Sequence, residues 1–517
     1  MEPLDTPDLD TASYWTETTR MPRYRTPPKD VVVDVVVVGG GITGITTAYL
    51  LKQAGATVAL LERERFSGVD TSRTTAHLTS VTDLRLHELQ KRFGGGAARA
   101  VWDAGGAAID QIAKLVDREE IACDFKWLPG YLHAPVGDRT VGTRRDLGKE
   151  TAAAAALGIR ADYFEQVPLF NTPGIRFPHQ AVFHPLHYLA ALLRKIPGKG
   201  SFVFESSPVE EILERPLAVK AGGVRLRCGY LVLATHNPLM GNTPEASALL
   251  FQSKLSLYSS YALGARLPKD SAVPGCWWDT ADPYHYLRIE NHRDHSYAIF
   301  GGEDHKTGQV ENTAAVYGRL ERVFRGLFPK GEVEHRWSGQ VIETADGLPY
   351  IGETAPHQFA ATGFSGNGMT FGTLAAMMAV DELHKRPNPW RDLFSVSRKK
   401  ILGGTWDYLA ENADYPYYLI RNWLAKSEGD DIEALKPGEG RILRLFGRKV
   451  AAHRARSGAI SLCSPVCPHL QCIVDWNNAE ETWDCPCHGS RFKPTGEVMS
   501  GPAEEDLEKI PLRPKPH

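Results

Sequence analysis

Two short segments near the C-terminus, "CPHLQC" and "CPCHGS", bring together residue types that bind metals. Thiolate and imidazole ligands in this order fit an iron–sulfur centre in which two cysteines hold one iron and two histidines hold the other. Zinc is the alternative, but a zinc finger normally takes its cysteines from one segment and its histidines from another. The sequence therefore predicts a metal centre, preferably [2Fe-2S], at Cys467, His469, Cys485 and His488.

The same segments, followed by "SGPAEEDL", resemble the Rieske [2Fe-2S] domain over residues 436–517. The resemblance implies that Cys472 and Cys487 form a disulfide between the two cluster loops. It also implies that Ser490 hydrogen-bonds a sulfur of the cluster and that Pro502 covers it. Ring-hydroxylating oxygenases also carry such domains, but they need a second iron held by two His and a carboxylate, and we find no motif for it.

The glycine run that follows "VVVDVVVV" is a second group of residues that could form a binding site. Gly39, Gly41 and Gly44 stand where a β-branched segment gives way to an apolar-periodic one, and Glu62 closes the next apolar run. A tight turn, close approach to a pyrophosphate and close helix packing require these glycines, and the acid accepts hydrogen bonds from a ribose. This order predicts a strand, helix and strand that bind a dinucleotide.

Further segments indicate which dinucleotide is bound. "GVDTSRTTAHLTS" (68–80), "ADGLPYIG" (345–352) and "ATGFSGNGMTFGTLAAMMAVDEL" (361–383) resemble the D-amino-acid oxidase superfamily of flavoproteins over residues 30–385. The resemblance implies FAD, with the G-F-S-G-x-G stretch opening a helix that points at the flavin ring. Besides the residues above, it implies cofactor contacts at Arg63, Arg73, Thr74, Thr75, Val209, Gly339, Asp346, Gly363, Gly366, Asn367, Gly368, Met369 and Thr370.

These motifs need three structural units to position them. The resemblance implies an α/β FAD-binding Rossmann-like domain, interrupted by an antiparallel-sheet substrate domain (α+β) at 110–175 and 245–335. Residues 386–435 mix prolines with helix-like spacing and are expected to form a helical linker. Short strand-like runs between glycine turns then predict an all-β Rieske domain over 436–517.

Candidates for catalysis lie on the expected antiparallel sheet. In "DPYHYLR", His285 and Tyr286 point to opposite faces of a strand, so one face looks toward the flavin. We expect His285, Arg288 and Tyr258 to act on the substrate. Sarcosine-oxidase-like relatives place a Lys for the substrate carboxylate where this chain has Thr370, which disfavours a plain amino acid unless Arg288 substitutes.

A two-electron cofactor and a one-electron cofactor in one chain predict a dehydrogenase. It would oxidise an amine or amino-acid-like molecule on FAD and pass electrons through the cluster to an unidentified one-electron acceptor. Two alternatives stay open. One is an oxygen-using flavin oxidase with a structural or redox-sensing cluster, and the other is a non-catalytic electron-transfer protein.

The composition excludes some classes of partner. The 517 residues carry a formal net charge of −3 with Lys and Arg scattered, which disfavours nucleic acid. The most apolar run is interrupted by Asp34 and is too short to span a bilayer, and the first residues lack the pattern of a signal peptide. We therefore expect a cytoplasmic protein without a transmembrane segment.

Overall fold

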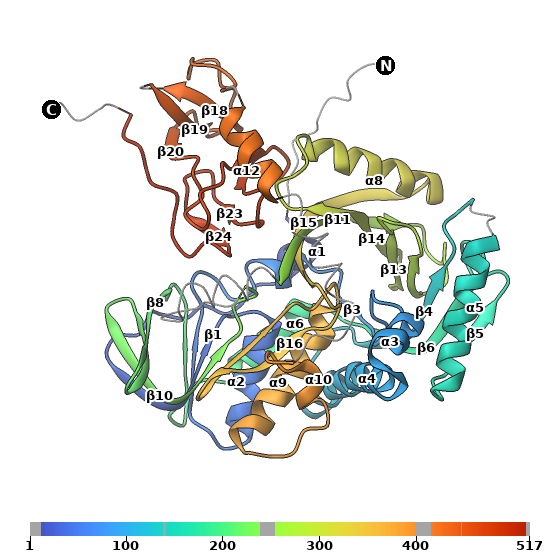
Figure 1. Cartoon of the computed structure of the whole chain (residues 1–517). Helices are drawn as coiled ribbons and strands as arrows, with labels where there is room; N and C mark the ends of the chain where they lie inside the picture. The colour runs from blue at the N-terminus through green and yellow to red at the C-terminus, as the bar shows by residue number, and fades with distance from the viewer. Residues whose placement is uncertain are drawn as a thin grey trace.

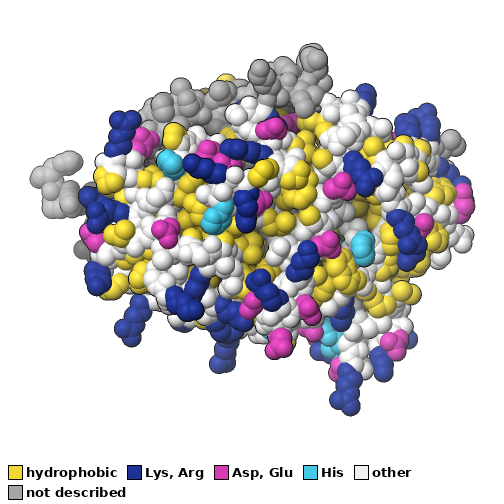
Figure 2. Space-filling model, turned by 90° about the horizontal axis from the view of Figure 1, so that it is seen from below, with side chains coloured by type: hydrophobic (Ala, Val, Ile, Leu, Met, Phe, Trp, Pro, Cys, Tyr) yellow, Lys and Arg dark blue, Asp and Glu magenta, His cyan; other side chains and the backbone are white. Residues whose placement is uncertain are grey.

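The computed structural model describes residues 12–137, 141–237, 254–398, 415–425, 427–445 and 447–512. Figure 1 shows two large units and a small C-terminal one, which lies beside α8 and above the unit that contains β1 and β10. None of the helices in these ranges is long and apolar enough to cross a membrane. The surface seen in Figure 2 has basic side chains interspersed with acidic and hydrophobic ones.

The first unit is an eight-stranded sheet whose centre is parallel. Strand β1 (Val31–Val38) pairs in parallel with β2 (Val58–Leu61) and β10 (Val224–Leu233), and the path is β16-β17-β10-β1-β2-β7. Val35, Val36 and Val37 are fully buried, as expected for a central parallel strand. The other strands are β7 (Phe202–Phe204), β8 (Val209–Glu214), β9 (Leu217–Ala221), β16 (Tyr350–Ala355) and β17 (Gln358–Thr362).

Helices α2 (Ile42–Gln53) and α9 (Gly368–Leu383) pack side by side on this sheet. Each begins at a glycine motif, so both N-termini lie at the edge where the parallel strands end. The other helices of the region are α6 (Pro185–Arg194), the 3₁₀ turn η1 (Asp70–Arg73) and α10 (Arg391–Phe394). This arrangement is the α/β FAD-binding unit that the sequence predicted.

The second unit is a nine-stranded, largely antiparallel sheet in the order β15-β11-β14-β13-β12-β4-β6-β3, with β5 paired to β6. Its long strands are β11 (Leu255–Leu267), β14 (Ser296–Lys306) and β15 (Glu332–Thr344). The others are β3 (His77–Leu78), β4 (Lys126–His133), β5 (Asp162–Phe164), β6 (Gly174–Val182), β12 (Gly275–Asp279) and β13 (Tyr286–Asn291). Helices α3 (Leu86–Phe93), α4 (Gly95–Arg118), α5 (Val141–Ala156) and α8 (Thr313–Leu327) accompany it.

The C-terminal unit contains two small antiparallel sheets. One is β18 (Glu439–Leu445), β19 (Arg448–Arg454) and β20 (Ile460–Cys463). The other is β21 (Asp475–Asn477), β22 (Thr482–Asp484), β23 (Arg491–Phe492) and β24 (Val498–Ser500). The predicted all-β class of this unit is confirmed.

Two short helices flank the larger units. Helix α1 (Tyr14–Thr18) inserts the buried Trp15, whose indole N–H donates to the Thr74 carbonyl at 2.6 Å. Helix α12 (Tyr415–Leu424) precedes the C-terminal unit, within the predicted linker. Parts of the predicted linker (399–414) and of the predicted substrate domain (245–253) lie outside the described residues, and the predicted domain boundaries stay predictions.

Candidate active site

A cavity of about 710 Å³ lies where the three units meet. The FAD-binding unit contributes the first glycine turn, residues 62–75 and 207–212, and the loop that opens α9. The antiparallel sheet contributes residues of β11, β13, β14 and β15. The C-terminal unit closes one side with residues 499–505. All three units therefore contribute residues to the lining of this cavity.

The first glycine turn leaves no room for side chains. Gly39 adopts a φ of +106°, and a Cβ there would lie 2.3 Å from the Ala234 carbonyl oxygen. A Cβ on Gly44 would lie 1.8 Å from the Gly39 carbonyl oxygen, which is how α2 approaches β1 so closely. Helix α2 begins beside the cavity, where its N-terminal N–H groups favour phosphate oxygens.

Glu62 follows β2 and borders the same part of the cavity. Its carboxylate accepts hydrogen bonds from the Gly40 and Glu64 backbone N–H groups at 2.8 and 2.9 Å. Burial raises the pKa of Glu62, although these two N–H groups favour the charged form. The acid is thus fixed beside the glycine turn, as the dinucleotide motif requires.

The second glycine loop and its surroundings fit a buried polar cofactor. Gly363 and Gly366 have φ values of +73° and +76°, and a Cβ on Gly363 would lie 2.3 Å from Thr344 Cγ2. Among the described residues, the buried Ser365 Oγ and Asn237 Oδ1 have no hydrogen-bond partner in the protein, and both residues border the cavity. Buried polar atoms of native proteins are normally satisfied, so the chain is shaped for a polar ligand here.

Most of the predicted cofactor residues line the cavity, but three do not. Those that border it are Gly39, Gly41, Glu62, Arg63, Arg73, Thr74, Thr75, Val209, Gly339, Gly363, Gly366, Asn367, Gly368 and Met369. Gly44 lies beneath the turn. Asp346 is held by the Arg398 guanidinium through contacts of 2.7 and 2.6 Å. Thr370 is fully buried in α9 and donates to the Thr79 carbonyl at 3.1 Å.

Arg288 does not line the cavity, and its predicted role as a substrate ligand stays a prediction. The side chain is 2% exposed and forms an ion pair with Glu290. Its other N–H groups donate to the carbonyls of Thr75, Ala76 and Phe183 at 3.0 to 3.1 Å. Arg288 therefore stabilises the segment that follows η1. Because residues two apart on a strand share a face, the R-x-E spacing was a signal for this pair.

The other two predicted catalytic residues also lie outside the cavity lining. His285 stacks on Phe300 and lies between the carboxylates of Asp279 and Glu303, at 3.7 and 3.8 Å. Burial opposes its protonation, but the acids nearby raise the pKa of His285 overall. Tyr258 in β11 is paired with Val341 and Lys306 of the adjacent strands.

The cavity wall is instead built from their neighbours Tyr284 and Tyr286, with Ser260 and two acids. Ser260 donates to Asp304 at 2.5 Å, so the Tyr286 hydroxyl donates to Ser260 at 2.7 Å. The Tyr284 hydroxyl donates to Asp83 at 3.4 Å. Burial raises the pKa of Asp304 to about 7 and that of Asp83 to about 6. Alternation placed Tyr286 on a strand face, but Tyr284 precedes β13 and was not predicted, and no pattern in the sequence indicated the acids.

The predicted cluster ligands come together between the loops of the C-terminal unit. The Cys467 and Cys485 thiols form a hydrogen-bonded pair, and the His469 and His488 rings have centroids 4.9 Å apart. The hydrogen bond from Cys485 lowers the pKa of Cys467, and burial lowers the pKa of His469 to about 4. Neutral imidazoles and a thiolate are the forms that bind iron, so this donor set fits a [2Fe-2S] cluster.

Two features support the cluster loops. Cys472 and Cys487 form a disulfide between them, as the resemblance implied. The Ser490 hydroxyl lies in hydrogen-bond contact with Cys467 and accepts the Ala503 N–H at 3.0 Å. The loop that contains Pro502 is thereby tied to the loop that contains His488.

Gln340 of β15 joins the cavity to both of these loops. The residue borders the cavity and is 4% exposed. Its amide donates to the Gly489 carbonyl at 2.8 Å and accepts a hydrogen bond from the Ser500 hydroxyl at 2.6 Å. Close packing supports the contact, because a Cβ on Gly308 would lie 2.8 Å from the Cys485 carbonyl carbon. Gln340 thus links the wall of the cavity to the loop that contains His488.

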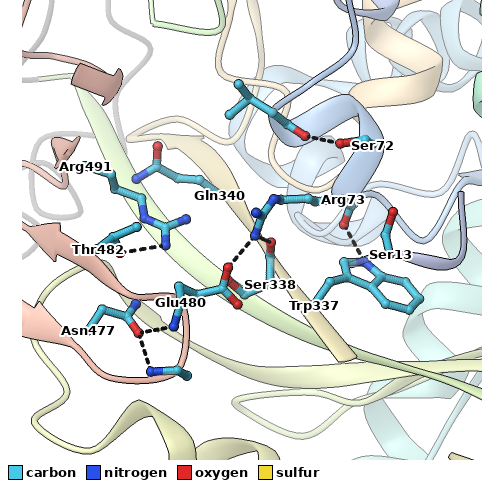
Figure 3. A network of polar contacts seen from close by, with 12 residues as sticks. Ser13, Ser72, Arg73, Trp337, Ser338, Gln340, Asn477, Glu480, Thr482 and Arg491 are labelled. Atoms are coloured by element: carbon cyan, nitrogen blue, oxygen red, sulfur yellow. Dashed lines mark hydrogen bonds and ion pairs between the residues drawn. The ribbon is translucent and has the colours of Figure 1, made fainter. Parts of the chain in front are cut away.

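A polar network fixes the C-terminal unit to the rest of the chain (Figure 3). Arg73, at the edge of the cavity, donates to the Ser338 carbonyl and forms an ion pair with Glu480 of the β21–β22 turn. The Tyr317 hydroxyl also donates to Glu480, at 2.9 Å. Thr313 donates to Asn477 at 2.7 Å. The exposed pair Lys493–Glu64 adds a peripheral contact at 2.7 Å.

Comparison with known proteins agrees with this geometry. The FAD dependent oxidoreductase family matches residues 34–382, and the Rieske [2Fe-2S] domain matches residues 423–511. The Rieske 2Fe-2S iron-sulfur protein YhfW of Bacillus subtilis (strain 168) is 33% identical over 507 residues, with 97% of each chain covered. Gamma-glutamylputrescine oxidoreductase of Escherichia coli (strain K12) is 24% identical, with 72% of this chain and 89% of the relative covered.

Solved structures show the same fold for the larger part of the chain. Glycine oxidase from Geobacillus kaustophilus superimposes with a TM-score of 0.58 and 17% identity, covering 72% of this chain and 100% of that one. L-proline dehydrogenase from P. horikoshii superimposes with a TM-score of 0.57 and 18% identity, covering 72% of this chain and 98% of that one. The chain belongs to the FAD dependent oxidoreductase family and carries, in addition, a C-terminal Rieske [2Fe-2S] domain.

Proposed function

We propose that the chain is a dehydrogenase that oxidises an amine or amino-acid-like small molecule and delivers the electrons through its own Rieske cluster to a one-electron acceptor. FAD, when bound, accepts a hydride, and the cluster accepts one electron at a time. The cytoplasmic location expected from the sequence stays a prediction.

One observation carries this proposal, namely the position of Gln340. Its side chain borders the flavin cavity and also hydrogen-bonds the loop of a cluster ligand. A cluster with a purely structural role would not need to share a wall with the flavin site. Residues 499–505 strengthen the argument, because the segment that covers the cluster in Rieske domains also closes the flavin cavity here.

The residues on the sheet side of the cavity suit amine oxidation. As a C–N single bond becomes C=N, the substrate loses two electrons and two protons, and its nitrogen must be neutral when the hydride leaves. Asp304 is suited to take the proton, because its raised pKa of about 7 lies near physiological pH. Tyr286 and Ser260 orient that carboxylate through successive hydrogen bonds.

A test of the electron path does not require the natural substrate. The flavin of the holoprotein is photoreduced without oxygen in the presence of a sacrificial donor, and the reduced cluster is followed by electron paramagnetic resonance. We expect the cluster to be reduced after the flavin, at a rate independent of protein concentration. A cluster that stays oxidised beside a reduced flavin would contradict the proposal.

The oxidase alternative makes a different prediction for His488→Ala, which removes a cluster ligand. If oxygen takes the electrons directly from the flavin, this variant will form peroxide in air at the wild-type rate. If electrons leave through the cluster, as we propose, turnover with an artificial one-electron acceptor will fall to a small fraction.

A further inference from the structure

We propose that the substrate is an organic amine cation without a carboxylate, held by Asp304 and Asp83 against the rings of Tyr284 and Tyr286. This inference rests on the proposed function and narrows its substrate class. It follows from the acidic and aromatic residues of the cavity wall beside the second glycine loop, and from the engagement of the arginines that border the cavity with other protein groups.

The two acids lie where a substrate must sit. Asp83 packs against the second glycine loop, because a Cβ on Gly366 would lie 3.1 Å from the Asp83 Oδ2 atom. Asp304, on β14 of the antiparallel sheet, borders the same cavity, and the charge of Asp83 adds to the burial that raises the Asp304 pKa. A ligand between them therefore meets a carboxylate on each side.

Neither acid forms an ion pair within the part of the chain that the structure describes. The hydrogen-bond partners of Asp304 and Asp83 are the hydroxyls of Ser260 and Tyr284, respectively. His285 and Arg85 affect these carboxylates only from beyond ion-pair distance, and His285 lies between Asp279 and Glu303. Asp304 is half-buried and Asp83 is exposed at the cavity. A bound ammonium group would give both carboxylates the cationic partner that neither finds in an ion pair among the described residues.

Aromatic rings complete the arrangement. Tyr284 and Tyr286 line the cavity with ring centroids 5.8 Å apart, and Trp278 borders the same region. Faces of aromatic rings attract ammonium groups, most strongly where water is excluded. His77, which also borders the cavity, adds no opposing charge, because burial lowers its pKa to about 4.

An α-amino acid would lack a partner for its carboxylate. Among the described residues, the arginines that border the cavity are Arg63, Arg65 and Arg73, and each is engaged. Arg63 donates to the Met499 carbonyl, Arg65 is paired with Glu205, and Arg73 is paired with Glu480. Arg288 is buried outside the cavity. The described cavity wall thus offers acidic side chains to a cation, whereas each of its arginines already has a partner in the protein.

Matched probe pairs test this selectivity directly. Pentylamine differs from norleucine, and cadaverine from lysine, only by the missing carboxylate. Each probe is added without oxygen to the holoprotein, and both the shift of the flavin spectrum on binding and the rate of flavin bleaching are recorded. We expect each amine to bind at least about tenfold more tightly than its amino acid, since a buried unpaired carboxylate is costly.

Variants identify the residues responsible. Asp304→Asn and Asp83→Asn should each weaken amine binding about ten- to hundredfold, the loss expected for a hydrogen bond to a charged group. Tyr286→Phe keeps the ring and should weaken binding less than Asp304→Asn. Asp103→Asn, at an exposed position of α4, is the control for the change of charge and should bind like the wild type.

The outcomes separate this inference from the proposed function. Tighter binding of norleucine or lysine than of their amines would overturn the substrate class, and so would amines that leave the flavin spectrum unchanged. Either result leaves the electron path intact if the photoreduced flavin still reduces the cluster. Loss of that reduction would instead contradict the proposed function, whatever the probes do.

Discussion

Asp304 and Asp83 are acids held in an environment that favours their neutral forms. For Asp304 partial burial is the main cause, and the substrate-free protein must tolerate it. Residues with displaced pKa values cluster at functional sites for this reason. These acids are therefore expected to lower the free energy of unfolding and, in return, to strengthen binding of the amine substrate.

This trade-off predicts a pH dependence. The native pKa of Asp304, about 7, exceeds its ordinary value of 3.8, so between these values the native state binds more protons than the unfolded state. Stability from this group therefore falls as pH rises through that interval. In thermal unfolding without substrate, the Asp304→Asn variant should have a higher melting temperature than the wild type at about pH 8, and this difference should shrink near pH 5. A variant less stable at both pH values would contradict this account.

Ser490 offers a second test at a single residue. Its hydroxyl contacts Cys467, and hydrogen bonds to cluster sulfurs stabilise the reduced form. Ser490→Ala should lower the reduction potential of the cluster, as measured by a redox titration followed by electron paramagnetic resonance. The flavin potential should not change, and a cluster potential equal to the wild-type value would contradict the role.

At the scale of elements, the β1–α2 turn shows how tightly packing constrains a motif. Gly44→Ala would place a methyl group against the backbone of Gly39, so helix α2 would have to shift away from the turn. We expect a loss of about 1–3 kcal/mol in stability and weaker FAD binding, measured by thermal unfolding and fluorescence titration.

The matched control is Gly106→Ala in α4, where an added Cβ meets no atom within 4 Å. Alanine is the better helix former, so this variant should gain about 0.5–1 kcal/mol. Equal effects of the two substitutions would show that the turn is not packed as described.

The elements that carry motifs were predictable from the sequence, while their neighbours were not. The glycine turns, their helices and the two cluster loops follow from local spacing, because each depends on residues within one segment. Asp83, Asp304 and Ser260 come from three separate segments: pairing of β11 with β14 brings Ser260 and Asp304 together, and Asp83 lies in a loop packed against Gly366. Likewise, nothing near helix α1 in the sequence reveals that Trp15 donates a hydrogen bond to the Thr74 carbonyl.

At the scale of the whole molecule, the Rieske domain is held in place. Gln340, Glu480 and Asn477 all form buried contacts across the interface. Such contacts keep the two candidate cofactor sites at a fixed spacing, so the electron transfer that we propose would need no domain movement.

This rigidity predicts that the rate of flavin-to-cluster transfer does not depend on solvent viscosity. Glu480→Gln removes the charge that pairs with Arg73 and should slow the transfer and make it sensitive to added sucrose. Lys493→Gln breaks only an exposed pair and should behave like the wild type, since surface ion pairs contribute little. A wild-type rate that falls with viscosity would show that the domain must move.

Helix α1 has a practical consequence for anyone who handles this protein. Trp15 donates to the Thr74 carbonyl beside the flavin cavity and lies over the Arg288 guanidinium. An affinity tag fused close to this helix, or a truncation that deletes it, would disturb the flavin pocket through residues distant in sequence. Tag position is therefore an experimental variable in measurements of cofactor content.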